Sequence, residues 1–242
     1  MARHLVSMLT CAVVASVCVS PALAAEALTS NIPPFSIENG SPPGFVREIL
    51  TEVAKRVGSD MPIVYGKSWP DSQKEAQTRP DTLVFPLART ASREASYQWL
   101  IKIIDMDVAF ATAPGKPVAD TDAATRAFAR IGVRDGAPME KELRGRGYTN
   151  LVVLKSSADC VQALHEGKID AWYAPAPEIA FNWIQQKFPA APVFGLKLET
   201  VPLFVAASRN TPGIDFAKWQ GAYAELDKDG TRSRILASYG LK

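Results

Sequence analysis

Two apolar segments that lie far apart in the chain predict the fold: DVAFATA at residues 107–113 and VPLFVAAS at residues 201–208. Each run has the length and composition of a buried strand. A polar break with proline and glycine, PGKPVADTD, follows the first segment, and helical patterns follow the second. If both strands cross between two lobes, residues 26–110 and 206–242 form one lobe and residues 111–205 form the other. Two such crossings make a hinge on which the lobes can close around a ligand.

Helix and strand patterns alternate along the rest of the chain. The segment PGFVREILTEVAKRVG, residues 43–58, places apolar residues on one face and charged residues on the other, and Gly58 ends it. We predict further helices at residues 138–147, 158–167, 176–188, 215–230 and 231–240. We predict strands at residues 61–68, 81–87, 105–113, 129–135, 149–156, 169–175 and 201–208. Strands separated by helices indicate an α/β protein with largely parallel or mixed sheets.

The N-terminus has the pattern of a secretory signal peptide. Arg3 supplies a positive region, residues 5–19 are mostly apolar, and PALAA places small residues at Ala22 and Ala24. The apolar part is shorter than the roughly 20 residues that cross a bilayer, which argues against a membrane anchor. We therefore expect cleavage after Ala24 or Ala25 and export of the remaining chain to the periplasm.

The charge and the few reactive side chains exclude several classes of protein. The net charge of +2 falls to +1 when Arg3 leaves with the signal peptide, whereas nucleic-acid-binding proteins carry a concentrated basic surface. Cys160 would then be the one remaining cysteine, and we expect it to be a packing thiol on a helix. With His165 as the one remaining histidine, the sequence lacks the parts of Ser-His-Asp, Cys-His and histidine-rich metal sites. We expect no cofactor, no metal and no catalytic residue.

Six landmarks along the chain carry a resemblance to a known family. They are NIPPFSIENGSPPGF from residue 31, Trp69, RTASREASYQW from residue 89, IGVRDG from residue 131, LHEGKIDAWY from residue 164 and YAELDKDGTRSRILASYG from residue 223. In this order and spacing, the chain resembles the family 3 periplasmic solute-binding proteins, which are the receptors of amino-acid-type ABC importers. The resemblance implies a type II periplasmic binding protein fold, with two lobes, two sheets flanked by helices and two hinge strands. It further implies a monomer that binds a small solute and delivers it to the membrane permease of an ABC transporter.

The segment LARTASRE, residues 87–94, holds the strongest ligand-binding candidate. The resemblance places Arg93 where the family binds a ligand α-carboxylate with the arginine of a T-x-x-R segment. A guanidinium pairs with both carboxylate oxygens, and α/β proteins bind ligands just past the ends of parallel strands. The alternative is a structural ion pair of Arg93 with Glu94 or Asp81. Arg89 has no such family role, so we expect a solvated charge at the rim of the site, with ligand contact as the alternative.

The ammonium half of an amino-acid site departs from the family pattern. Family members place an aspartate at the position of Pro175, five residues after the equivalent of Asp170. We interpret Asp170 itself as structural. Glu178, the next acidic residue, either replaces the missing ammonium partner or interacts with the dipole of the helix that it begins. The expected solute carries a carboxylate and is an amino acid, a derivative or an organic acid.

Further candidates lie at the other strand ends. Trp172 and Tyr173 alternate in direction on a strand, so we expect one of them in the core and the other facing the ligand. After Gly136, Pro138 replaces a family threonine, which removes one amide donor but suits the first position of a helix. The remaining candidates are Ala88, Trp69, and Thr29 and Asn31, for which loop capping is the alternative.

Two other classes of function stay open beside a solute-binding protein. Periplasmic cyclohexadienyl dehydratases share the expected fold and need a carboxylate as general acid or base, and Glu178 would be that residue. A ligand-sensing receptor that acts on a membrane partner in trans is the other alternative. A binding protein without chemistry is the leading interpretation.

Overall fold

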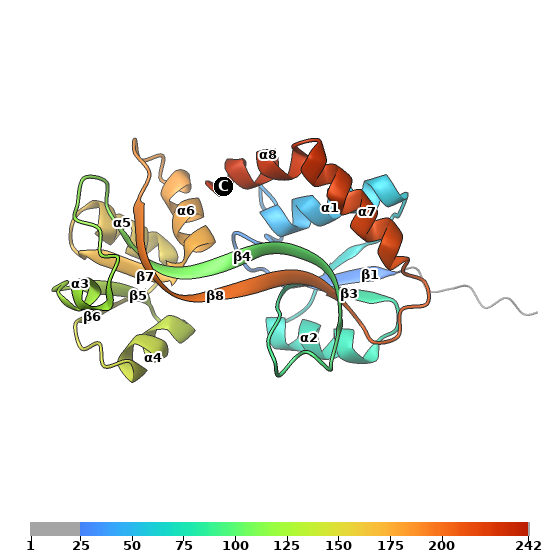
Figure 1. Ribbon diagram of the computed structural model, residues 1–242, viewed down its shortest axis with the longest axis horizontal. Coiled ribbons are helices and arrows are strands. Elements are labelled where there is room, and N and C mark those ends of the chain that lie inside the picture. Colours follow the sequence, from blue (N-terminus) through green and yellow to red (C-terminus); the bar gives the residue numbers. More distant parts are fainter. Residues whose placement is uncertain (1–24, 242) are drawn as a thin grey trace, which may run out of the picture.

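A single sheet of eight strands runs through the computed structural model, which describes residues 25–241 (Figure 1). The predicted signal peptide, except for its last residue, lies outside the described residues. The strand order is β2-β1-β3-β8-β4-β7-β5-β6. The strands are β1 (Glu26–Thr29), β2 (Ile63–Tyr65), β3 (Thr82–Ala88), β4 (Gln98–Thr112), β5 (Ile131–Arg134), β6 (Leu151–Leu154), β7 (Ala171–Pro175) and β8 (Val193–Ala207).

Helices cover both faces of this sheet. They are α1 (Phe45–Val57), α2 (Trp69–Thr78), α3 (Asp122–Arg126), α4 (Pro138–Gly145), α5 (Ser157–His165), α6 (Ala176–Gln185), α7 (Phe216–Lys228) and α8 (Thr231–Ser238). Figure 1 shows α1, α5, α6, α7 and α8 on one face, and α2 and α4 on the other. Helix α1 buries the face that its sequence pattern predicted, and Gly58 ends it with a left-handed backbone. Within the described residues, no helix combines the length and apolar character needed to cross a bilayer.

Strands β4 and β8 pair antiparallel along their whole length, from Gln98 opposite Ala207 to Thr112 opposite Val193. They form the hinge, because β8 also pairs with β3 of the first lobe and β4 also pairs with β7 of the second. The first lobe here comprises β1–β3 with α1, α2, α7 and α8, and the second comprises β5–β7 with α3–α6. The two-lobed α/β fold is confirmed. The two expected sheets are one continuous sheet, because each hinge strand serves both lobes.

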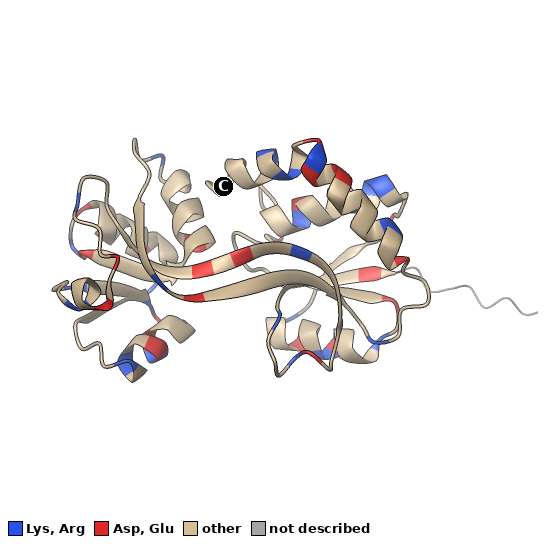
Figure 2. Cartoon of the chain, in the orientation of Figure 1, with Lys and Arg blue, Asp and Glu red and all other residues tan. Residues whose placement is uncertain are grey.

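Charged residues lie along the middle of the hinge strands (Figure 2). Lys102 pairs with Asp105 along β4, and Asp107 accepts hydrogen bonds from Lys197 and Thr200 of β8. The four charged side chains are at least one-third exposed. The middle of the hinge is therefore held by backbone pairing and surface ion pairs, together with partly buried apolar side chains of β4 that pack against the core of each lobe.

Each lobe is stabilised by its own apolar packing. In the first lobe, α1, α7 and α8 pack against the sheet around Phe45, Ile49 and Leu226. In the second lobe, α5 and α6 pack around Trp172 on one face, and α4 packs beside Tyr173 on the other. Burial of one large apolar side chain contributes about 1.5–3 kcal/mol, so clusters of this kind stabilise each lobe separately.

The end of the chain joins the two lobes at a second place. The ring of Tyr239, just after α8, stacks on Phe181 of α6, with centroids 5.7 Å apart. The Tyr239 hydroxyl accepts a hydrogen bond from the N–H of Gly44 (2.8 Å) and donates one to Glu48 (2.5 Å). Gly44 has a φ of 102° and lies so close to the backbone of the preceding loop that a side chain would not fit. The start of α1 and the side of α6 are thereby connected through one tyrosine.

Asp170 ties β5 to β7 at the ends that point away from the first lobe. Its carboxylate accepts hydrogen bonds from the backbone N–H of Arg130 (2.8 Å) and from the Arg130 guanidinium (2.7 Å). The hydrogen bond from the guanidinium holds the pKa of Asp170 below its usual range. The structural role expected for Asp170 is therefore present.

Asp170→Asn removes the charge from this link, and we expect the free energy of unfolding to fall by about 1–2 kcal/mol at pH 7. The pKa of Asp170 is lowered by folding, so its contribution is present above the unfolded pKa of about 3.9 and is lost as the pH falls below that value. Urea unfolding at pH 7 and pH 3 measures both effects.

Glu52→Gln is the control for Asp170→Asn, because it removes only an exposed pair with Lys55. It should change the free energy of unfolding by less than about 0.5 kcal/mol. If Asp170→Asn lost as much stability at pH 3 as at pH 7, the stabilisation would not be electrostatic.

Candidate functional site

The parallel strands of the first lobe end together at one edge. Because β1 runs parallel to β2 and β3, the segments that follow Thr29, Tyr65 and Ala88 lie at the same end of the sheet, and they are called the first edge below. Thr29 is level with Tyr65, and β3 continues beyond them to Ala88. Strand β3 runs antiparallel to β8, with Ala88 opposite Leu203. Since β8 enters the first lobe from the second, β3 runs toward the second lobe. The first edge therefore faces the second lobe.

The strands of the second lobe end in the opposite direction. β5 runs parallel to β6 and β7, so Arg134, Leu154 and Pro175 mark one edge, called the second edge below. β7 runs antiparallel to β4, with Pro175 opposite Val108, and therefore runs toward the first lobe. Along β4 the two edges are separated by the stretch from Ile104, level with the end of β3, to Val108. At roughly 3.4 Å per residue this is about 13 Å, a spacing that suits a small molecule in contact with both edges.

Arg93 lies at the first edge, in the turn between β3 and β4. Its side chain is half-buried, and its Nη1 donates a hydrogen bond to the carbonyl oxygen of Ala88 at 3.1 Å. Neither ion pair considered from the sequence forms, because Glu94 pairs with Arg89, and Asp81 accepts a backbone hydrogen bond at the other end of β3. Within the described part of the chain, no carboxylate pairs with the Arg93 guanidinium. A guanidinium with free donors at a strand end is suited to bind an anion.

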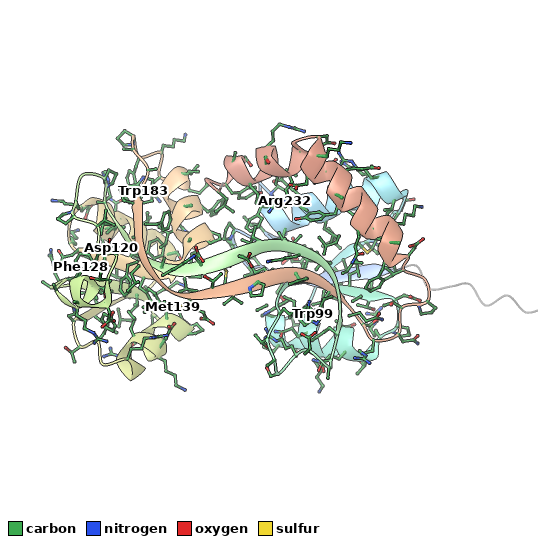
Figure 3. The ribbon with its side chains drawn as sticks, viewed as in Figure 1. Trp99, Asp120, Phe128, Met139, Trp183 and Arg232 are labelled. Carbon is green, nitrogen blue, oxygen red and sulfur yellow. The ribbon has the colours of Figure 1, made fainter. Side chains whose placement is uncertain are left out.

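Arg89, by contrast, is engaged by its neighbours. Its Nε and Nη2 donate hydrogen bonds to the two carboxylate oxygens of Glu94, at 2.9 and 2.5 Å, and this interaction lowers the pKa of Glu94. The guanidinium also lies over the rings of Trp99 and Phe204, 5.3 and 5.4 Å from their centroids. Trp99 lies on the α2 face of the hinge strands (Figure 3). Arg89 is therefore a rim charge that is paired and stacked rather than freely solvated.

The other candidates of the first edge have local partners. Thr29 is buried, and its hydroxyl donates a hydrogen bond to the carbonyl oxygen of Ser30. Asn31 is exposed, and its Oδ1 accepts a hydrogen bond from the N–H of Glu38 at 3.1 Å, which is the loop-capping alternative. Trp69 is the first residue of α2 and is half-buried against a cluster that includes the end of β3. Trp69 thus supplies an apolar ring close to the end of β3.

At the second edge, Gly136 is exposed with a φ of 67°, and Pro138 is the first residue of α4, as expected. Glu178 lies in the first turn of α6. It accepts a hydrogen bond from the hydroxyl of Ser157 and pairs with Arg134 at 3.4 Å, and its side chain is only 14% exposed. A carboxylate with two partners and so little exposure is poorly placed to bind an ammonium group or to transfer a proton to a ligand.

Trp172 and Tyr173 are both fully buried, so the expectation that one of them faces a ligand is wrong. They do point to opposite faces of β7, but helices cover both faces there. Trp172 packs with α5 and α6, whereas Tyr173 packs beside α4 and donates a hydrogen bond to Glu142 at 3.0 Å. In a sheet that is covered on both sides, alternation separates two cores rather than a core and a binding surface.

Arg134 is a residue of the second edge that no landmark of the sequence singled out. It is the last residue of β5, and its side chain is 39% exposed. The signal that marked Arg93, a guanidinium directly beyond a buried parallel strand, is also present for Arg134 in IGVRDG.

A cavity of about 420 Å³ lies beside the hinge, on the face that carries α6 and α8. Asp105, Asp107, Pro177 and Arg232 are among its lining residues. Arg232 is labelled in Figure 3. The two aspartates are paired with lysines, and Arg232 pairs with Asp227. Within the described residues, no group of histidine, cysteine, aspartate and glutamate side chains is arranged to hold a metal ion. The two facing edges are therefore the stronger candidate site.

Several solved structures share the fold of this chain. The second substrate-binding domain of a putative amino acid ABC transporter from Streptococcus pneumoniae is 16% identical, with a TM-score of 0.69 over 89% of this chain and 99% of that chain. The GluR0 ligand-binding core from Nostoc punctiforme, in complex with L-glutamate, is 18% identical, with a TM-score of 0.63 over 89% of this chain and 98% of that chain. A histidine kinase sensor domain with similarity to periplasmic binding proteins is 15% identical, with a TM-score of 0.59 over 89% of this chain and 95% of that chain.

No protein-family model matches the chain, and no curated protein matches it in sequence. At identities below 20%, the likenesses to solved structures establish the fold. The chain has the two-lobed fold of periplasmic binding proteins, as the resemblance in its sequence implied.

Cys160 is fully buried on α5, and burial raises the pKa of its thiol to about 12, as expected for a packing thiol. We predict that iodoacetamide at pH 8 leaves Cys160 unlabelled in the folded protein and labels it after unfolding in guanidinium chloride. Peptide mass spectrometry distinguishes Cys160 from Cys11 and Cys18. Labelling of the folded protein at the rate of a free thiol would contradict this prediction.

Proposed function

We propose that this protein is a solute-binding protein that captures a small carboxylate-bearing solute, such as an amino acid or a derivative, between its two lobes. The observation that carries the proposal is the state of Arg93. Its guanidinium lies at the first edge, bonded to the carbonyl oxygen of Ala88 and, among the described residues, paired with no carboxylate. A ligand carboxylate accepts two parallel hydrogen bonds from such a group, and the pairing strengthens when closure excludes water.

Closure would occur by bending of β4 and β8. We place the bend in the stretch between the two edges, residues 104–108 of β4 and the opposite residues 199–203 of β8. The bounds expected from the sequence, 26–110 with 206–242 for one lobe and 111–205 for the other, fall a few residues outside that stretch. That stretch carries exposed charged side chains, and Ile104 and Met106 are only partly buried there, so a change of its backbone angles disrupts less packing than a change within a lobe core. Rigid lobes on a pliable pair of strands match the hinge type of domain closure.

A solute bound to Arg93 would meet further groups on both edges. On the first edge, Trp69 would pack against the apolar part of the solute, while Thr29 and Asn31 border the site. On the second edge, the exposed Gly136 leads into α4, whose first amides point toward the ligand side as the start of a helix does. Arg89 would stay at the rim. Pairing of Glu178 with Ser157 and Arg134 favours binding without chemistry.

Two cellular settings fit a protein of this fold. The likeness to a substrate-binding domain of a putative amino acid ABC transporter supports delivery to a membrane permease, and the likeness to a histidine kinase sensor domain supports signalling. We favour an importer receptor that works as a monomer in the periplasm, because the landmarks in the sequence resemble family 3 receptors. The binding site and its chemistry would be the same in either setting.

Arg93→Ala should abolish thermal stabilisation by the solute and shift the Tm of the unliganded protein by no more than about 1–2 °C. The solute is found first by a thermal-shift screen of the parent protein against amino acids, organic acids and polyamines. A ligand at 100 times its Kd stabilises by about 2.7 kcal/mol, so even a modest binder is detected.

Arg144→Ala is the matched control, because it removes an exposed arginine that pairs with Glu140 within α4. It should keep the ligand response of the parent protein. Arg93→Lys keeps the charge without the planar fork and should retain part of the response. Stabilisation by polyamines alone, or an Arg93→Ala variant that binds as tightly as the parent, would overturn the proposal.

A further inference from the structure

The two edges are more basic than the chain as a whole. The segments at and just beyond the strand ends are residues 29–31, 66–68, 88–94, 134–137, 154–157 and 175–178. Their basic residues are Lys67, Arg89, Arg93, Arg134 and Lys155, and their acidic residues are Glu94, Asp135 and Glu178. Glu94 and Glu178 are already paired inside the protein, each with an arginine of its own edge. A solute between the edges therefore meets an excess of positive charge.

Arg134 is the last residue of β5, a strand whose end faces the first lobe. Its Nε lies 3.4 Å from Glu178, so one side of the fork faces the protein. Among the described residues, its two terminal nitrogens form no hydrogen bond, and its side chain is 39% exposed. The outer side of the fork thus offers a pair of donors with the geometry of a carboxylate.

Glu178 positions Arg134 rather than serving a ligand. The hydroxyl of Ser157 donates to the same carboxylate oxygen that pairs with Arg134, which links the starts of α5 and α6 to the end of β5. Pro175, at the end of β7, contributes no charge where the family has its ammonium partner. Asp135 is the exposed acid of the second edge whose carboxylate has no partner within the described residues.

We propose that Arg134 binds a second carboxylate, so that the solute is a dicarboxylate held by Arg93 on the first lobe and by Arg134 on the second. This inference rests on the proposed function and narrows it to one class of solute. Two guanidiniums that approach each other as the lobes close repel, which disfavours closure of the empty site. A solute with one carboxylate leaves the terminal nitrogens of one guanidinium without a hydrogen-bond acceptor, whereas a dicarboxylate supplies an acceptor for both, and selectivity follows from that difference.

The test compares solutes that differ by one charge. Glutarate is matched by its monomethyl ester, and L-glutamate is matched by L-glutamine, in isothermal titration of the full protein at low salt. We expect one or both diacids to bind, and each matched compound with a single carboxylate to bind about 10- to 100-fold more weakly, as for loss of one charge-assisted pair.

Arg134→Ala should weaken binding of the diacid by a similar factor and remove the discrimination between the diacid and its matched compound. In Arg134→Ala alone, Glu178 would be buried without its arginine, and that could itself weaken binding. The double variant Arg134→Ala/Glu178→Gln removes both charges of the internal pair and therefore shows whether this effect contributes to the loss of affinity. It should bind as Arg134→Ala does. Arg144→Ala, an exposed arginine of the same lobe, should leave both affinities unchanged.

The outcomes separate the two proposals. If amino acids with one carboxylate bind as tightly as the diacids, or if Arg134→Ala keeps the discrimination, a second carboxylate at Arg134 is ruled out while the proposed function stands. A second carboxylate is likewise ruled out if Asp135→Asn abolishes binding of a neutral amino acid and no diacid binds, because the second edge then recognises an ammonium group. If no carboxylate compound binds, both proposals fall.

Discussion

The antiparallel pairing of β4 with β8 is the constraint on which the rest of the structure depends. Both strands pass through both lobes, and their other partners, β3 and β7, run antiparallel to them. β3 must therefore end toward the second lobe, and β7 must end toward the first. Each lobe adds its remaining strands parallel to β3 or β7, so all their carboxyl ends face the same interval of β4. The location of the candidate site follows from strand direction alone, before any side chain is considered.

Much of this architecture can be predicted from the sequence, and the parts that cannot have physical causes. The stripe of apolar residues in α1 and the stop at Gly58 specify that helix, because one face must be buried. The full length of the hinge strands cannot be predicted from the sequence, because Lys102, Asp105 and Asp107 interrupt the apolar pattern where the strands are exposed. Helix α2 likewise has no apolar stripe, because it buries little besides Ser72 and Ala76.

Part of the candidate site can likewise be predicted from the sequence. The position of Arg93 after a strand and the chemistry of its guanidinium are enough to propose it as a ligand-binding residue. Its guanidinium has no carboxylate partner because Glu94 pairs with Arg89 instead, and the sequence does not determine which arginine Glu94 pairs with. Alternation along β7 predicts that Trp172 and Tyr173 point to opposite faces of the sheet. It does not predict how many faces helices cover, and both side chains are buried in the core. Arg134 satisfies the same rule as Arg93. It lies within the landmark IGVRDG, but the resemblance assigns it no ligand-binding role.

The energetics of closure explain why both edges have to contribute. Moving a two-state hinge from 1:99 to 99:1 requires a ligand that favours the closed state by about 5.5 kcal/mol. A single charge-assisted hydrogen-bonded pair contributes about 1.5–3 kcal/mol. In the proposed site, the pair between Arg93 and the solute carboxylate can form before the lobes close. Contacts confined to the first edge favour the closed state only as far as the exclusion of water strengthens them. In the proposed closure, most of the driving free energy would therefore come from groups of the second edge that reach the solute only when the lobes come together. The same free energy would have to offset any change at the Tyr239–Phe181 contact between the lobes.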